Sequence, residues 1–92
     1  MLKNGKVNTV KIQVYFVCQE VVGDMKDGIY EVAEGSTIRD LFSVCEKENN
    51  IFIKDEYRRW LVFLADGKQA QWDTVLHKVN TVHIIRAAVG GE

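Results

Sequence analysis

The chain has 92 residues, of which 47% are hydrophobic and 27% are charged, and its formal net charge is -1. This length and composition are typical of one small globular domain. Lys and Arg are scattered, so the basic stripe of a nucleic-acid-binding or membrane-surface protein is absent. The longest apolar runs, Val14–Cys18 and Trp60–Ala65, are far shorter than the ~18 residues of a membrane-spanning helix. The opening residues MLKNGKVNTV lack the apolar segment of a signal peptide, so we expect a cytoplasmic protein with no nucleic-acid or membrane partner.

Cysteine and histidine are too few and too dispersed to predict a metal site. Cys18 and Cys45 form no C-x-x-C pair and lie in no His/Cys cluster, so we expect two reduced, partly buried thiols and no zinc. His77 is expected in a turn and His83 in a strand, which suggests neither a metal pair nor a catalytic dyad. No bound cofactor is expected.

The first predicted elements are two strands that form a hairpin. Strict alternation puts one set of side chains on a buried face (Val10, Ile12, Val14 and Phe16) and another on the opposite face (Lys11, Gln13 and Tyr15). Turn signals follow at Gly23-Asp24 and Asp27-Gly28, and residues 29–33 form a second, short strand.

The clearest helix follows the hairpin. Thr37 and Asp40 have the spacing of a capping box, in which the hydroxyl and the carboxylate each accept from a free backbone N–H at the helix start. Apolar residues then recur at helical spacing on one face: Ile38, Leu41, Phe42 and Cys45. Asn49-Asn50 suits the helix end, and the apolar face requires the hairpin as its partner.

Residues 51–60 are ambiguous and read as a loop with a short extra helical turn. Its charged residues are expected to be solvated: Asp55, Glu56, Arg58 and Arg59. A strand, an Asp66-Gly67 turn and a short fourth strand follow, flanked by Trp60 and Trp72 in the core or at its rim.

The last predicted elements are a turn region and a final strand. In the turn region, Val75 and Leu76 are expected to point inward. The final strand places Val82 and Ile84 on one face and His83 and Ile85 on the other.

The element order β, β, α, β, β, β predicts an α+β fold with one sheet face covered. Five short strands around one helix form a ubiquitin-like β-grasp with a mixed sheet. The first and last strands are the most apolar and are expected side by side at its centre. We expect residues 1–86 to form this domain and residues 87–92 to form a flexible tail with a Gly-Gly pair.

Three stretches carry a family resemblance in the expected order: EVAEGSTIRDLF, LADGKQAQWDTVLHKVNTVHII and AAVGG. Together they resemble the small sulfur carriers of the MoaD/ThiS type, which include the small subunit of molybdopterin synthase and the thiamine-pathway carrier. The long segment between helix and third strand is closer to the molybdopterin carrier. The resemblance implies a non-enzymatic protein that serves as a substrate or as a small synthase subunit.

The resemblance also implies the chemistry of the tail. A MoeB/ThiF-like adenylating enzyme would use ATP to activate the carboxylate of Gly91, and sulfur would displace AMP to give a thiocarboxylate. That sulfur would serve molybdopterin or tungstopterin synthesis, and the thiamine pathway and cysteine synthesis are the less favoured destinations. A synthase large subunit would be a further partner. The tail residues are small: Ala87, Ala88, Val89, Gly90 and Gly91. Extended, they span roughly 16 Å, which suits entry into a narrow active site.

Two features depart from the family pattern. Arg86-Ala87-Ala88 stands where the family has a proline, and Glu92 follows the second glycine. As written, the carbonyl of Gly91 is an amide that cannot attack ATP. We therefore expect a peptidase to remove Glu92 first, and a tail whose glycine pair has no function remains the alternative.

The open sheet face is the candidate docking surface, because Tyr15, His83 and Ile85 would lie there beside the emerging tail. Scattered surface apolar residues also occur without function. Two other functions stay open beside the sulfur carrier. One is a ubiquitin-like module that binds without covalent chemistry, and the other is a protein modifier joined to lysines through Gly91.

Overall fold

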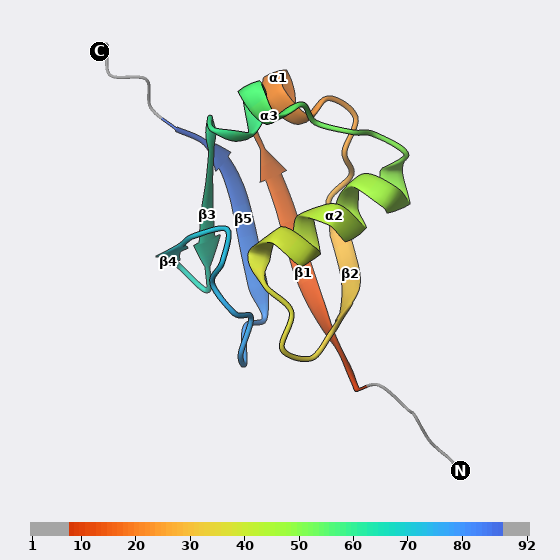
Figure 1. Cartoon of the computed structure of the whole chain (residues 1–92), viewed down its shortest axis with the longest axis vertical. Helices are drawn as coiled ribbons and strands as arrows, with labels where there is room; N and C mark the ends of the chain where they lie inside the picture. The colour runs from red at the N-terminus through yellow and green to blue at the C-terminus, as the bar shows by residue number, and fades with distance from the viewer. Residues whose placement is uncertain (1–7, 88–92) are drawn as a thin grey trace.

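The computed structural model describes residues 8–87. In chain order its elements are β1 (Thr9–Val17), α1 (Gln19–Val22), β2 (Gly28–Ala33), α2 (Ile38–Asn49), α3 (Asp55–Arg58), β3 (Leu61–Ala65), β4 (Lys68–Ala70) and β5 (Thr81–Arg86). The strands form one mixed sheet in the order β2-β1-β5-β3-β4, and α2 crosses one of its faces (Figure 1). The predicted α+β class with a mixed five-stranded sheet and one long helix is confirmed. Within residues 8–87, no helix is long and apolar enough to cross a bilayer.

The centre of the sheet is the parallel pair of β1 and β5, as predicted. Val14 lies beside Val82 and Phe16 beside Ile84, and all four side chains point into the core. On its other side β5 pairs antiparallel with β3, where Phe63 lies beside Ile84. The end of the described chain therefore follows directly on a strand that is hydrogen-bonded to a neighbour on both sides.

The capping box predicts the start of α2 correctly. The Thr37 hydroxyl accepts from the Asp40 N–H at 3.3 Å, and the Asp40 carboxylate accepts from the Thr37 N–H at 3.0 Å. The predicted buried face is also correct, since Ile38, Leu41, Phe42 and Cys45 are all at most 1% exposed. The helix ends at Asn49, and Asn50 then adopts a left-handed conformation with φ of 55°.

On the covered face, an aromatic cluster joins α2 to β3 and to the segment after β4. The Phe42 ring lies edge-on to Phe63 and Trp72, with centroid distances of 6.2 Å and 5.4 Å. Phe42 and Phe63 are buried, whereas Trp72 is half-buried at the rim. Edge-to-face contacts of this kind add to the free energy gained by burying the rings.

Two details of the connections differ from the sequence-based prediction. The connection between β1 and β2 contains the short helix α1, whose Val22 is fully buried, in addition to the predicted turns. Val75 does not point inward with Leu76: Val75 is 51% exposed and Leu76 only 2%. Val75 forms an isolated bridge with Thr37, and side chains alternate sides along extended backbone, so only one of the two neighbours can face the core.

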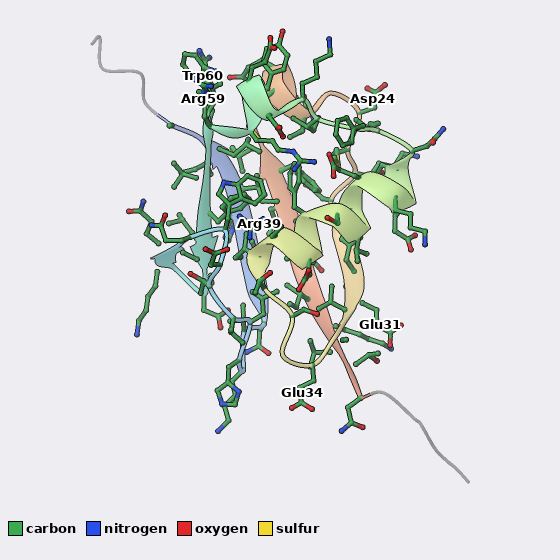
Figure 2. All side chains as sticks on the ribbon, in the orientation of Figure 1. Asp24, Glu31, Glu34, Arg39, Arg59 and Trp60 are labelled. Atoms are coloured by element: carbon green, nitrogen blue, oxygen red, sulfur yellow. The ribbon has the colours of Figure 1, made fainter. Side chains whose placement is uncertain are left out.

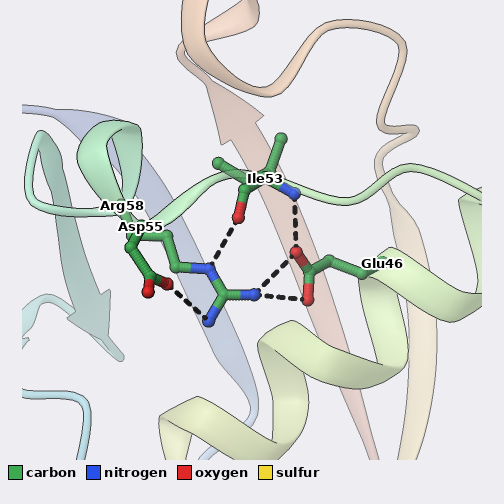
Figure 3. A network of polar contacts seen from close by, with 4 residues as sticks. All are labelled: Glu46, Ile53, Asp55 and Arg58. Carbon is green, nitrogen blue, oxygen red and sulfur yellow. Dashed lines mark hydrogen bonds and ion pairs between the residues drawn. The ribbon is translucent and has the colours of Figure 1, made fainter.

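Arg58 was predicted to be solvated, and this is wrong. One guanidinium nitrogen, Nη2, lies 2.9 Å from both oxygens of Glu46, and Nε donates to the Ile53 carbonyl at 2.9 Å (Figure 3). The Glu46 carboxylate also accepts from the Ile53 N–H at 2.8 Å. This network fastens the segment after α2 to the helix itself. Its charged neighbours are exposed as predicted: Asp55, Glu56 and Arg59.

Candidate functional site

The face of the sheet opposite α2 carries the three predicted docking residues. Tyr15 lies beside His83 in the register of β1 and β5, and their rings stack with centroids 5.0 Å apart and planes 22° apart. Ile85 lies one step further along the same face of β5, between Val17 on β1 and Val62 on β3. The prediction that Tyr15, His83 and Ile85 share a face is therefore confirmed.

Three neighbours on this face were missed by the sequence analysis: Val17, Val62 and Leu64. Val17 is 62% exposed and continues the alternation of β1 beyond Tyr15, so the sequence did carry its signal. Val62 and Leu64 join the face only through the pairing of β3 with β5, which no sequence period reveals. We call the six residues of this surface the open-face patch: Tyr15, Val17, Val62, Leu64, His83 and Ile85.

The open-face patch lies toward the end of β5 that leads to Ala87. At the start of β5, Thr81 pairs with Gln13, a polar neighbour, and Lys11 lies further away along β1. The apolar residues Val17 and Ile85 lie at the other end. A partner that docked on these apolar side chains would therefore lie beside the point where the chain continues toward Gly90 and Gly91.

Two contacts hold the end of β5. The Ala87 N–H donates to the Trp60 carbonyl at 2.6 Å, and Arg86 forms an ion pair with Glu20 at 3.1 Å. The Arg86 guanidinium lies 5.6 Å from the centroid of the Trp60 ring, which Figure 2 shows at the α3 end of the sheet. Hydrogen bonding by the backbone at Glu20, and then by Arg86, lowers the pKa of the Glu20 carboxyl. A cleft of about 390 Å³ adjoins these side chains.

Of the predicted tail residues, the structure describes only Ala87, which is half-buried. The other predicted reactive and tail positions lie outside the described residues: Ala88, Val89, Gly90, Gly91 and Glu92. The structure therefore describes the end of β5 and the first residue of the predicted tail.

Both thiols lie in the hydrophobic core and are buried more completely than the partial burial that the sequence predicted. Cys18 and Cys45 are both free and 0% exposed. Burial raises the pKa of Cys18 to about 11 and that of Cys45 to about 12. Because the thiolate is the nucleophilic form, these raised pKa values leave both thiols protonated and weakly nucleophilic near pH 7.

The histidines lie apart, with His77 exposed in the loop before β5 and His83 stacked on Tyr15. Across residues 8–87, no three His, Cys, Asp or Glu side chains are grouped as metal ligands. The described site therefore offers a surface for contact with a partner: the open-face patch, which lies next to the end of β5. Comparison with models of known protein families and with curated proteins finds no match to this chain.

Proposed function

We propose that this chain is a sulfur carrier with a ubiquitin-like β-grasp fold, and that it acts as a protein substrate rather than as an enzyme. In this proposal a partner enzyme adenylates the carboxylate of Gly91, which is then converted to a thiocarboxylate for molybdopterin or tungstopterin synthesis. Thiamine synthesis is the less favoured destination.

One observation carries the proposal: the strand that leads to the Gly-Gly pair is the central strand of the sheet, and it carries His83 and Ile85 of the open-face patch. Only Ala87–Val89 separate the end of β5 from Gly90. The β1 and β3 ladders and the Ala87–Trp60 hydrogen bond fix the start of that segment. A carrier needs a contact surface beside a fixed start of the tail, because the partner must bind the globular domain while the chain end reaches into the active site.

The chemistry requires a free carboxylate at Gly91. The peptide bond to Glu92 must first be hydrolysed by a peptidase. A carboxylate oxygen of Gly91 then attacks the α-phosphorus of ATP, the bond to pyrophosphate breaks, and an acyl adenylate forms. A hydrosulfide donor supplied by a partner forms the C–S bond while the C–O bond to AMP breaks.

The small tail residues suit passage into a narrow site. Ala87–Gly91 spans roughly 16 Å when extended, which reaches from the edge of a docked domain into an enclosed active site. Glycine has no Cβ, so the backbone at Gly90 and Gly91 can lie close to phosphate oxygens.

The adenylation step is tested by ATP–pyrophosphate exchange with the MoeB/ThiF-like enzyme of the same cell. A chain ending at Gly91 should support exchange, whereas the full chain, verified by mass to retain Glu92, should be inert. A chain ending at Gly90 should react poorly because its carboxylate falls about 3.3 Å short of the α-phosphate. Gly91→Val in the trimmed chain should also fail, because the added side chain crowds the channel. Equal exchange by full-length and trimmed chains would contradict the carboxylate mechanism.

The docking surface is tested by a matched pair of substitutions on the same sheet face. Ile85→Asp introduces a charge in the open-face patch, whereas Ile29→Asp makes the same change on β2, where Ile29 is 65% exposed. Calorimetry should show weakened binding of the adenylating enzyme for Ile85→Asp and unchanged binding for Ile29→Asp. Equal affinity of both variants and the wild type would move the docking site elsewhere.

A ubiquitin-like module that binds without covalent chemistry is the second candidate, and a protein modifier is a variant of the first. The observation that favours the module is the open-face patch, which can contact a partner whether or not Gly91 is free. The intact mass of the protein from its own cell separates these functions. Loss of the glutamyl residue with replacement of one oxygen by sulfur indicates the carrier. An added target chain indicates the modifier, and the unchanged mass indicates the module.

A further inference from the structure

The two edges of the sheet differ in length. β4 forms one edge and has only three residues, Lys68–Ala70, so it offers little backbone for pairing. β2 forms the other edge with six residues, Gly28–Ala33. A strand at a sheet edge presents unpaired peptide groups that another extended segment can bind.

Two hydrogen bonds reveal which peptide groups of β2 point outward. The Glu34 N–H donates to the Asn8 carbonyl at 2.9 Å, and the Gln13 N–H donates toward β5, to Asn80, at 2.9 Å. Because hydrogen-bonded pairs alternate in an antiparallel ladder, the even-numbered residues of β2 bond to β1. The backbone groups of Ile29, Glu31 and Ala33 therefore point away from the sheet.

Nearly all of these outward groups are unpaired within the described residues. The Ala33 carbonyl accepts from the Ser36 N–H at 3.0 Å. Within residues 8–87, the N–H groups of Ile29, Glu31 and Ala33 and the carbonyls of Ile29 and Glu31 have no hydrogen-bond partner. They have the alternating spacing that an added strand requires.

The charge around this edge indicates what kind of strand would bind. Residues 24–34 contain four acidic side chains and one lysine, whereas the whole chain has a net charge of only -1. Asp24, Glu31 and Glu34 lie on the β2 side of the molecule (Figure 2). Glu31 accepts a hydrogen bond from the Thr9 hydroxyl and faces Lys11 on β1, and its side chain lies on the open face. A second copy pairing through β2 would bring two such acidic segments together, which disfavours self-association.

We propose that the outer edge of β2 binds an extended, basic segment of a partner protein, which joins the sheet as an additional strand. Its side chains opposite Ile29 and Ala33 would be apolar, and the one opposite Glu31 would be Lys or Arg. The intervening side chains would point toward the α2 side. This pattern reads apolar-x-basic-x-apolar in either strand direction, so it does not depend on whether the added strand is parallel or antiparallel. The interaction uses neither the tail nor the open-face patch, and it is independent of the sulfur-carrier proposal.

The first experiment uses a synthetic peptide, acetyl-Thr-Val-Thr-Lys-Thr-Val-Thr-amide, and the full chain. Amide hydrogen exchange followed by NMR should slow at Ile29, Glu31 and Ala33 when the peptide is added. The Tyr30 and Val32 amides already bond to β1 and should change little. Replacing the peptide lysine by glutamate should weaken binding about 2- to 10-fold, and Glu31→Lys in the protein should reverse that preference. No protection of the three outward amides, or protection caused by self-association in sedimentation, would overturn the proposal.

The second experiment removes one outward donor and leaves the β1–β2 ladder intact. Glu31→Pro deletes the outward N–H of residue 31, and proline is tolerated at a sheet edge where the N–H faces solvent. Peptide binding should fall at least tenfold, whereas Glu31→Gln, which keeps that N–H, should lose only the charge-dependent part. Wild-type affinity in a folded Glu31→Pro protein would exclude strand addition. If that variant does not fold, the amide-exchange measurement on the wild type decides the question.

Discussion

The two faces of the sheet come from the same strands, yet they differ in what covers them. In β1, Ile12 and Val14 are 0% exposed under α2, whereas Tyr15 and Val17 on the opposite face are 39% and 62% exposed. Strand alternation alone produces this division. The covered face is therefore expected to provide stability, and the open face is free to provide recognition. Substitutions of similar size should lower the free energy of unfolding strongly on the covered face and only slightly on the open face.

The largest effect is expected from Phe42→Ala on the covered side. Phe42 is 1% exposed and contacts the rings of Phe63 and Trp72, so removing its ring leaves a cavity beside them. The free energy of unfolding should fall by about 3–5 kcal/mol in urea denaturation.

Phe52→Ala is the matched control, because Phe52 is 73% exposed and its ring centroid lies 5.1 Å from the Arg58 guanidinium carbon. Its cost should stay below about 1 kcal/mol. If Phe42→Ala cost less than about 0.5 kcal/mol, α2 would not cover the sheet in this register.

The second-largest effect is expected from loss of the contact between Arg58 and Glu46, which joins α2 to the segment after it. Arg58→Ala leaves the nearly buried carboxylate of Glu46 without the guanidinium nitrogen that contacts both of its oxygens, and it removes a cation from the Phe42 and Trp72 rings. We expect a loss of about 2–4 kcal/mol by the same denaturation measurement. Arg59→Ala, next to it but exposed, should stay within about 0.5 kcal/mol. If both variants lost the same free energy of unfolding, the positive charge itself would stabilise the fold, and not the contact with Glu46.

Local sequence patterns predicted most of the sheet and the helix, but they did not predict the contact between Glu46 and Arg58. The alternation of β1 and the Thr37–Asp40 capping box each depend on neighbours within a few residues, so the sequence states them directly. Glu46 and Arg58 are twelve residues apart on different elements, and only the folded path of the chain brings them together. Charged residues are usually exposed, and that general tendency gave the wrong prediction for Arg58.

The candidate site was predictable to the extent that it follows strand alternation. Tyr15, His83 and Ile85 each occupy the odd-numbered side of a strand, and the parallel pairing of β1 with β5 joins them. Val62 and Leu64 depend on which strand lies on the other side of β5, which requires long-range pairing. The acyl chemistry assigned to Gly91 depends on residues beyond Ala87 and stays a prediction for the exchange assay.

A smaller effect is expected at the start of the covering helix. Thr37→Ala removes the hydroxyl that accepts from the Asp40 N–H, and the unfolding free energy should fall by about 1 kcal/mol. Ser43→Ala is the control on the same helix, because Ser43 is exposed and lies within the helix, where alanine is the better helix former. It should be neutral or slightly stabilising. A loss at Ser43 as large as that at Thr37 would contradict a capping role.

The smallest effect concerns the stacked pair on the open face. Tyr15 and His83 have ring centroids 5.0 Å apart, but Tyr15 is 39% exposed, so water competes with the contact. A double-mutant cycle of Tyr15→Ala, His83→Ala and the double variant should give a coupling free energy of about 0.5 kcal/mol, the low end for aromatic pairs. Gln13 and Thr81, which face each other on the same two strands, form a control pair with a smaller coupling. A coupling above about 2 kcal/mol would mean that the open face is packed as tightly as the covered one, and that its residues serve stability. Coupling near the expected value, with little loss in either single variant, leaves these rings available for contact with a partner.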